Sequence, residues 1–578
     1  MICYKFQKKP YLCIIFQISI FAFNYFMLNS ALKSQIDTLW DKFWSGGMAN
    51  PITAIEQISY LLFMRRLEDT PNHLEYFAGE KQNCRWSVFM EITDDTQLFS
   101  HVRDTVFPFI QNLNNEVFSR HMKNAVFEIT KPSLLRAAIK SIDAIYTLTQ
   151  NQNQQFQDIG DIYEYLLNEI ARSGKNGQFR TPRHIIQMVC ALLDPDMADV
   201  EHGKIGDPAC GTSGFLLGAY LHILSKNSSD DKKITNEDGF ALSTIGDKLT
   251  AEQRKKLETT AFKGYDFDTT MVRFGLMNLL LHGVSTPDIQ YQDTLSKQYE
   301  ADTENGSYSV VLANPPFKGS IDKHDLNTDL LKSTIMNKVK KTRKKAEELP
   351  LIDEDGTPIP QKIEKEKEPE PYTNKTELLF LLRIIKMLKK GGRAGVIVPE
   401  GVLFGATDAH KEIRKRLTYQ CSMDAVISLP SGVFKPYAGV ATAVLIFTKK
   451  HEDVPIKPAT KNVWFFGVEN DGYEFNDKRT KKWINKANNQ PDYGDLQTIV
   501  SIFKNKTNLD NKDRKGQYFE VPIKEVETAF FNLSMAQYKK LEYIEPQFET
   551  PQQILATLAQ HENAIAGYLK TINDLINV

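Results

Sequence analysis

Four consecutive residues near the middle of the chain could do chemistry on an aromatic amine. Asn314 to Phe317 follow an apolar run from Ser309 that is typical of a buried strand, and Pro315 and Pro316 forbid continuation of helix or sheet. The Asn314 side-chain oxygen and the Pro315 carbonyl can both accept from one exocyclic amino group, which makes its nitrogen nucleophilic. Phe317 can stack on a base extruded from a duplex. Taken alone, the Asn-Pro-Pro turn is also open to a purely structural interpretation.

Two upstream segments could hold a ligand beside this turn. Residues 205–215 place a strand end, a glycine turn and a helix start in sequence, which lets backbone approach a ligand at the carboxyl edge of a sheet. The next predicted strand ends at Asp266, whose carboxylate can accept both hydroxyls of a ribose. A glycine turn that merely packs is an equally open interpretation. Asp268 is predicted to cap the following helix.

A parallel sheet has to position these residues. After Gly177, short β-branched runs alternate with helical stretches, which is typical of a sheet covered by helices on both faces. The pattern predicts an α/β fold with a doubly wound, Rossmann-like sheet that is closed by a late hairpin. The predicted strands are Lys204 to Asp207, Ala261 to Asp266, Asp288 to Gln292, Ser309 to Ala313, Arg393 to Val398, Ala425 to Leu429 and Thr442 to Phe447.

The rest of the sequence predicts three regions after residue 26. Residues 27–155 carry helical periodicity and predict an N-terminal all-helical domain. Residues 156–450 predict the catalytic domain, with a polar insertion over 318–375 that holds a basic run and an acidic, proline-bearing run. Residues 451–578 end in a predicted helix, which fits docking of a partner or packing on the chain's own domain. Its apolar residues are Ile554, Leu555, Leu558, Ile565, Leu569 and Ile572.

Residues 1–26 fit none of these regions. The run from Tyr11 to Leu28 is almost wholly apolar and resembles a signal-peptide core or a marginal membrane span. No small-residue cleavage site follows it, and Gln17 and Asn24 interrupt it. We therefore predict that translation starts at Met27, with a signal or anchor as the alternative.

The composition limits the class of protein. With 42% hydrophobic and 25% charged residues over 578 positions, the chain has the make-up of a globular protein. The net charge of −1 gives no overall basic excess, so contact with nucleic acid has to come from local patches or from a partner. The six cysteines form no CxxC pair, which favours a reducing cytosol and argues against structural zinc. No GxxxxGK[ST] loop is present, so ATP-driven steps would need another protein.

The motifs resemble a known family. The segments 207–214, 314–317 and 177–183 look like motifs I, IV and X of amino-methylating DNA methyltransferases, and their order along the chain is similar to the gamma class of N6-adenine enzymes. Within that class the chain resembles the HsdM-like M subunits of type I restriction-modification systems. The likeness extends over Asp37 to Gly47, Val398 to Phe404, Leu429 to Phe434 and Asp471 to Arg479. It implies the sheet of a class I methyltransferase.

The resemblance also implies the activity and the site. The chain would be a site-specific DNA adenine-N6 methyltransferase that uses S-adenosyl-L-methionine and no metal. The catalytic residues would be Asn314, Pro315, Pro316 and Phe317. The cofactor-binding residues would be Gln178, Phe179, Arg180, Thr181, Pro182, Arg183, Asp207, Gly211, Thr212, Ser213, Gly214, Asp266 and Asp293. Asp266 would hold the ribose and Asp293 would face the adenine, while 178–183 and 212–214 would line the methionine end.

Two departures from the family pattern leave the local cofactor geometry open. Arg180 stands where relatives often carry an aromatic residue, and Ser213 stands where they often carry glycine. The insertion after Phe317 is also long for the family.

The implied partners are DNA, a specificity subunit that reads the target sequence, a restriction subunit in the full complex and a second copy of this chain. No membrane is implied, and the expected location is the cytoplasm. Two rival hypotheses remain. One is methylation of glutamine on a protein, which can use the same Asn-Pro-Pro turn. The other is a catalytically silent DNA-binding scaffold, which would be favoured only if Asn314 or the glycine turn were degraded.

Overall fold

The computed structural model describes most of the chain, namely residues 30–69, 73–113, 116–150, 155–172, 180–334, 372–482, 484–485, 490–505, 514–540 and 550–576. The predictions made for residues 1–26, for Gln178 and Phe179, and for the two charged runs of the insertion (338–345 and 364–371) lie outside the described residues.

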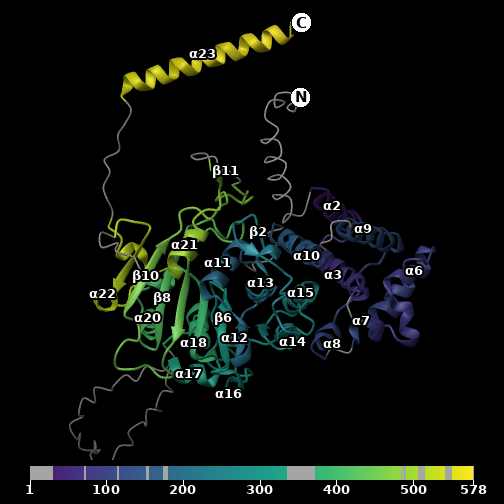
Figure 1. Ribbon diagram of the computed structural model, residues 1–578, viewed down its shortest axis with the longest axis horizontal. Helices are drawn as coiled ribbons and strands as arrows, with labels where there is room; N and C mark the ends of the chain where they lie inside the picture. Colours follow the sequence, from purple (N-terminus) through teal and green to yellow (C-terminus); the bar gives the residue numbers. More distant parts are fainter. Residues whose placement is uncertain are drawn as a thin grey trace, which may run out of the picture.

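A nine-stranded sheet forms the centre of the molecule (Figure 1), in the order β13-β10-β8-β9-β7-β6-β1-β4-β5. The run from β7 to β5 is parallel throughout, whereas β9 pairs antiparallel with both β7 and β8. The strands are β1 Lys204–Asp207, β4 Phe262–Asp266, β5 Asp288–Tyr291, β6 Tyr308–Ala313, β7 Leu388–Pro399, β8 Cys421–Leu429, β9 Thr442–Lys449, β10 Asn462–Gly467 and β13 Tyr518–Pro522.

The burial of β6 shows why this region forms a sheet with two covered faces. All six residues of β6 are buried, and alternate side chains point to opposite faces because the side-chain period of a strand is two. Val310 and Leu312 belong to the apolar cluster under α11 (Arg183–Leu193), α13 (Gly214–Lys226) and α21 (Leu496–Lys504). Val311 and Ala313 belong to the cluster under α18 (Thr376–Met387) and α20 (Asp408–Tyr419). The predicted doubly wound α/β fold is confirmed.

The sheet continues past residue 450. All seven predicted strands are present, but β10 and β13 were not predicted. They extend the sheet on the side of β8, where β10 pairs parallel with β8 and antiparallel with β13. The predicted boundary at residue 450 therefore falls between strands of one sheet.

Helices make up the N-terminal part, at the purple end of the chain in Figure 1. The helix α3 begins where Asn50 accepts a hydrogen bond from the Ile52 amide and Pro51 takes the first helical position, both of which favour a helix start. The helices of this part are α2 Ser30–Ser45, α3 Pro51–Glu68, α4 His73–Tyr76, α5 Trp86–Phe89, α6 Asp95–His101, α7 Phe107–Gln111, α8 Glu116–Met122, α9 Pro132–Gln150 and α10 Gln155–Arg172.

This helical part shares its core with a helix of the sheet region. The side chains of Met271, Phe274, Met277 and Leu281, all on α15 (Thr269–Leu281), belong to the same buried cluster as those of α2, α3, α9 and α10. An ion pair of 2.5 Å between Arg273 on α15 and Glu56 on α3 joins the two parts as well. Because α15 follows directly on Asp266, the helical part is packed against an element that begins at the predicted cofactor site.

The remaining elements are short connections and the tail. They are α12 Met197–His202, α14 Ala251–Thr259, α16 Ala301–Glu304, α17 Thr328–Thr334, α19 Gly401–Phe404, α22 Ile523–Thr528 and α23 Pro551–Ile576, with small hairpins β2 Ile234–Thr235 with β3 Ala241–Leu242 and β11 Ile484–Asn485 with β12 Gln490–Pro491. The helix α23 projects away from the rest (Figure 1), and all of its described side chains are exposed. Within the described part of the chain, no helix has both the length and the apolar character that crossing a membrane takes.

Candidate active site

A cavity of about 600 Å³ opens at the carboxyl ends of β1, β4, β5 and β6. Its volume lies within the range of roughly 300–1,000 Å³ that small-molecule sites occupy. It is found where open α/β sheets bind their ligands. Eight of the predicted site residues line it, namely Arg180, Gly211, Thr212, Asp266, Asp293, Asn314, Pro316 and Phe317.

The glycine turn and Asp266 form one wall of this cavity and hold each other in place. Gly211 has a φ of +52°, which favours glycine, and its amide donates to Asp266 Oδ2 at 2.9 Å. The other oxygen of Asp266 accepts from the Asp268 amide at 2.9 Å. A carboxylate offers about four acceptor sites, so two are left for the hydroxyls of a ribose. Asp268 caps α15 by accepting from the amides of Thr270 and Met271, as predicted.

Two carboxyl groups interact electrostatically at this wall, Asp207, which is buried, and Asp266, which is half-buried. Asp207 is 2% exposed and accepts from the Ala209 amide at 3.0 Å, so its side chain lies under the turn and does not line the cavity. Burial, with the charge of Asp266 adding to it, raises the pKa of Asp207 to about 8. Burial also raises the pKa of Asp266. A cation bound nearby would lower both pKa values, because a positive charge favours the ionised form of a carboxyl group.

The Asn314 side chain is oriented by a neighbour from another element. Its Nδ2 donates to Thr181 Oγ1 at 3.0 Å, and its Oδ1 is buried without a hydrogen-bond partner among the described residues. A buried acceptor without a partner is costly, and a bound donor would remove that cost. Thr181 does not line the cavity, but it fixes the direction of the residue that does. Pro315 is buried beside it.

The cavity lining includes the predicted residue Phe317 and further residues that the sequence did not predict. Phe317 is only 7% exposed, and its ring meets Phe434 edge to face at 5.9 Å between centroids. The loop that follows Phe434 supplies Tyr437 and Val440 to the cavity lining, and α18 supplies Phe380. The segment 429–434 had been noted only as part of the family likeness, and nothing in its spacing indicated that the loop after it reaches the cavity.

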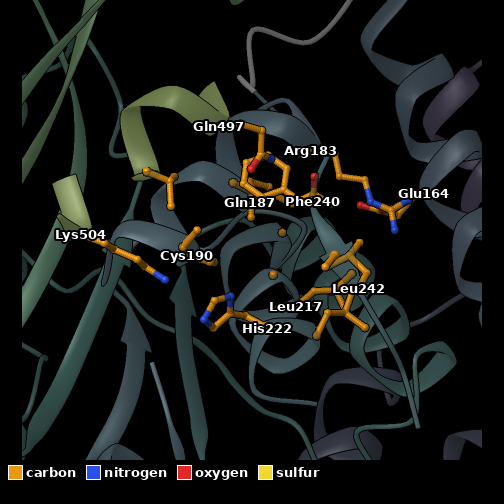
Figure 2. A pocket seen from close by; sticks show the side chains of 17 residues that line it. Glu164, Arg183, Gln187, Cys190, Leu217, His222, Phe240, Leu242, Gln497 and Lys504 are labelled. Atoms are coloured by element: carbon orange, nitrogen blue, oxygen red, sulfur yellow. The ribbon is translucent and has the colours of Figure 1, made fainter. Parts of the chain in front are cut away.

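Arg183 does not line the large cavity, and Figure 2 shows it beside Glu164 at a second cavity. It is the first residue of α11, and its guanidinium donates to Asp161 at 2.8 Å and lies 3.5 Å from Glu164. Together with Gln187 and Cys190 it lines a separate, smaller cavity of about 220 Å³ between α11 and α13. Arg183, which the resemblance put at the methionine end of the cofactor, therefore lines a different cavity from the one that Asp266 and Asn314 line.

Three other predicted residues do not line the large cavity either. Pro182 precedes α11 and Gly214 begins α13, where an added Cβ would lie 3.1 Å from Ile186. Ser213 is fully buried with a φ of +60°, a conformation in which glycine would be unstrained. Ser213 is therefore a strained residue in this turn.

A cluster of possible metal ligands at the junction with α10 is occupied by arginines. Asp161, Glu164 and His282 bring ligand atoms within 4.8 Å of one another. Arg180 donates to the Glu164 carboxylate at 2.6 Å, and Arg183 donates to Asp161. Because guanidinium groups take both carboxylates, we interpret the cluster as an ion-pair network that fastens residues 180–183 to α10.

Comparison with known proteins identifies the family. The sequence model of N-6 DNA methylases matches residues 154–346 and 359–547, which include the glycine turn, Asp266 and Asn314. The chain belongs to the N-6 DNA methylase family. The model of the HsdM N-terminal domain matches residues 32–142 of this N-6 DNA methylase, within its helical part. The resemblance to HsdM-like methyltransferases is confirmed.

Several proteins similar to this N-6 DNA methylase are methylase subunits of type I restriction enzymes. The methylase subunit of the type I restriction enzyme EcoEI from Escherichia coli is 28% identical over 456 residues, which cover 76% of this chain and 77% of that protein. The methylase subunit of the type I restriction enzyme EcoKI from Escherichia coli (strain K12) is 26% identical over 461 residues, which cover 78% and 74%.

Solved structures share the fold of this N-6 DNA methylase. A chain from a study of assembly and conformational transition in the type I R-M system matches with a TM-score of 0.60 at 23% identity, covering 95% of this chain and 98% of that one. A type I restriction-modification methyltransferase subunit from Streptococcus thermophilus matches with a TM-score of 0.57 at 17% identity, covering 88% of this chain and 100% of that one.

The cofactor of this family is S-adenosylmethionine, and the cavity volume and the free acceptor sites of Asp266 fit it.

Proposed function

We propose that the chain transfers the methyl group of S-adenosylmethionine to the N6 of adenine in DNA, as the modification subunit of a type I restriction-modification complex. The observation that carries the proposal is the Asn314 Oδ1 atom, which is buried and lacks a hydrogen-bond partner in the described part of the chain. It belongs to a residue that lines the same cavity as Asp266. An aryl amine supplies the donor that such an oxygen lacks.

The chain's own residues act mainly by binding and orientation. Thr181 holds the Asn314 carboxamide with its oxygen free, and Pro315 offers its carbonyl as the second acceptor for the amine. Two acceptors fix the nitrogen and raise the electron density of its lone pair. Phe317 and the loop bearing Tyr437 offer aromatic surface for an extruded base.

The cofactor would be held at the other end of the cavity. Asp266 would bind its ribose, Asp293 would face its adenine, and Gly211 and Thr212 would border its methionine end. When bound, it supplies an electrophilic methyl group on a sulfonium. Positioning of that group and the amine accounts for most of the rate that we expect from this site.

Partners would complete the activity on DNA. The relatives named above are methylase subunits, so we propose that a separate specificity subunit reads the target and that a restriction subunit and a second copy of this chain join the full complex. The net charge of −1 supports this division, because holding duplex DNA takes several lysine or arginine contacts with phosphates. The cytoplasmic location and the domain limits at residues 27–155, 156–450 and 451–578 stay predictions.

The tail helix α23 is the proposed docking element for the specificity subunit. Its large apolar side chains are 45–71% exposed, and the described side chains of the helix are exposed throughout. The alternative, packing on the chain's own domain, would have buried one of its faces. Exposed apolar residues at helical spacing suit a helix of a partner. They are Ile554, Leu555, Leu558, Ile565, Tyr568 and Leu569.

The test is Asn314→Ala with labelled cofactor, a specificity subunit and its target DNA. We expect methyl transfer to be lost while the cofactor dissociation constant stays the same, because Asn314 faces the amine. Asn327→Ala is the matched control, since Asn327 is a buried asparagine that bonds Tyr299 and Asp329 outside the cavity lining. Retained activity in Asn314→Ala would overturn the proposed role.

A further inference from the structure

A fully buried guanidinium lies directly behind the adenosine end of the cavity. Arg383 on α18 is 0% exposed and is surrounded by the apolar cluster on that face of the sheet. Among the described residues no carboxylate lies within ion-pair distance of it, and its Nη2 atom has no hydrogen-bond partner. Burial lowers its pKa. Burying a cation without a paired anion destabilises the folded state, so we expect the contacts of Arg383 to serve a function.

The contacts of Arg383 converge on the loop after β5. Its Nε donates to the Thr294 carbonyl at 2.9 Å, and its guanidinium carbon lies 4.4 Å from the centroid of the Tyr299 ring. A weaker contact of 3.4 Å joins Nη1 to Asn305 Oδ1. The guanidinium thus lies over an aromatic ring while it donates to one backbone carbonyl.

The loop that Arg383 fixes is part of the cavity wall. Thr294 and the neighbouring Asp293 line the cavity, and Thr294 Oγ1 donates to the Pro208 carbonyl at 3.2 Å in the glycine turn. Phe380 lies one helical turn before Arg383 on α18 and lines the cavity as well. Arg383 therefore joins α18, the β5 loop and the β1 turn behind one end of the ligand site.

We propose that Arg383 is a positioning residue for the adenosine half of the cofactor. It does not touch the ligand, because it is fully buried behind Thr294. It holds the Thr294 carbonyl away from the cavity and thereby sets where the Asp293 side chain stands. The proposal rests on the proposed function only in taking S-adenosylmethionine as the ligand.

The experiment measures binding apart from turnover. Calorimetry on the full chain with S-adenosylmethionine, and separately with 5′-methylthioadenosine as a probe of the adenosine half, gives the dissociation constants of Arg383→Met and Arg383→Lys. Lys449→Met is the matched control, because Lys449 is also a buried cation that bonds a backbone carbonyl, that of Leu388, but it lies outside the cavity lining.

We expect Arg383→Met to weaken both ligands by the same factor, about tenfold or more, and Arg383→Lys to recover part of the loss. The methylation rate at saturating cofactor should stay within about threefold of the parent, since Asn314 is untouched. Lys449→Met should lower the unfolding temperature without changing either dissociation constant. Should Arg383→Met not fold, the Lys variant carries the same comparison.

Unchanged binding in the Arg383 variants, or an equal loss in Lys449→Met, would overturn the proposal. Weaker binding of S-adenosylmethionine alone would also overturn it, because the effect would then lie at the methionine end. A parent chain that binds neither ligand would contradict the proposed function itself, which keeps the two failures apart.

Discussion

Replacing Asp266 by asparagine tests the cofactor wall at one atom. Both carboxylate oxygens of Asp266 already accept from backbone amides, those of Gly211 and Asp268, at 2.9 Å each. Asparagine keeps one acceptor oxygen and turns the other into a donor, so one of these amides loses its partner. The remaining oxygen is neutral and has fewer acceptor sites left for a ribose.

The size of the effect follows from the lost charged acceptor. A hydrogen bond to a charged group contributes about 1.5–3 kcal/mol, which corresponds to a rise in the cofactor dissociation constant of roughly 10- to 150-fold. Loss of the partner for a half-buried amide also destabilises the turn, by about 1 kcal/mol. Gly211 belongs to the turn that borders the cavity, so the lost charged acceptor and the less stable turn would both weaken cofactor binding.

The assay is equilibrium dialysis with labelled S-adenosylmethionine, run well below the unfolding temperature of each variant. Asp268→Asn is the control, because asparagine caps a helix as well as aspartate does and Asp268 does not line the cavity. We expect its dissociation constant to stay within about twofold of the parent. An unchanged constant in Asp266→Asn, or an equal rise in both variants, would refute the assignment of Asp266 to the ribose.

Three further predictions concern charge, strain and assembly. The affinity for the cationic cofactor should rise with pH and level off above about pH 8. The reason is that burial raises the pKa values of Asp207 and Asp266, and only their ionised forms attract a cation. A calorimetric affinity that does not change with pH would contradict this. Gly275→Ala should lower the free energy of unfolding by roughly 1–3 kcal/mol in urea, because the new Cβ would meet Ser213 Oγ. The loss should be smaller when Ser213 is first replaced by glycine, and equal losses in the two backgrounds would exclude that contact. Deleting Pro551 to Val578 should impair co-purification with the specificity subunit more than cofactor binding, and full stoichiometry without the tail would show that docking lies elsewhere.

The parallel strands and their ligand turns were predictable because their signals are local. An apolar run that ends in Asn314-Pro-Pro, or one that ends in a glycine turn, predicts both a strand and the position of its carboxyl end from about ten neighbouring residues. The strand β6 was accordingly predicted from Ser309, one residue after its start at Tyr308. Asp268 was predicted as a helix cap for the same reason, since a cap needs only its own helix.

The features that were missed depend on contacts between distant segments. Nothing near Arg183 indicates that Asp161 and Glu164 will pair with it outside the lining of the large cavity, because those carboxylates stand on α10, which packs against α15. The strand β10 was missed because it only becomes a strand by pairing with β8 and β13. The contribution of Tyr437 likewise follows from how the β8–β9 loop folds over the sheet edge.

The most direct test of the central claim is sequencing of DNA from cells that express the chain with its specificity subunit, by a method that detects N6-methyladenine base by base. The account predicts N6-methyladenine at one recurring target sequence, and its disappearance when Asn314→Ala replaces the parent chain at the same expression level. Methylation on another base, or N6-methyladenine that persists at the same sites in Asn314→Ala, would contradict it.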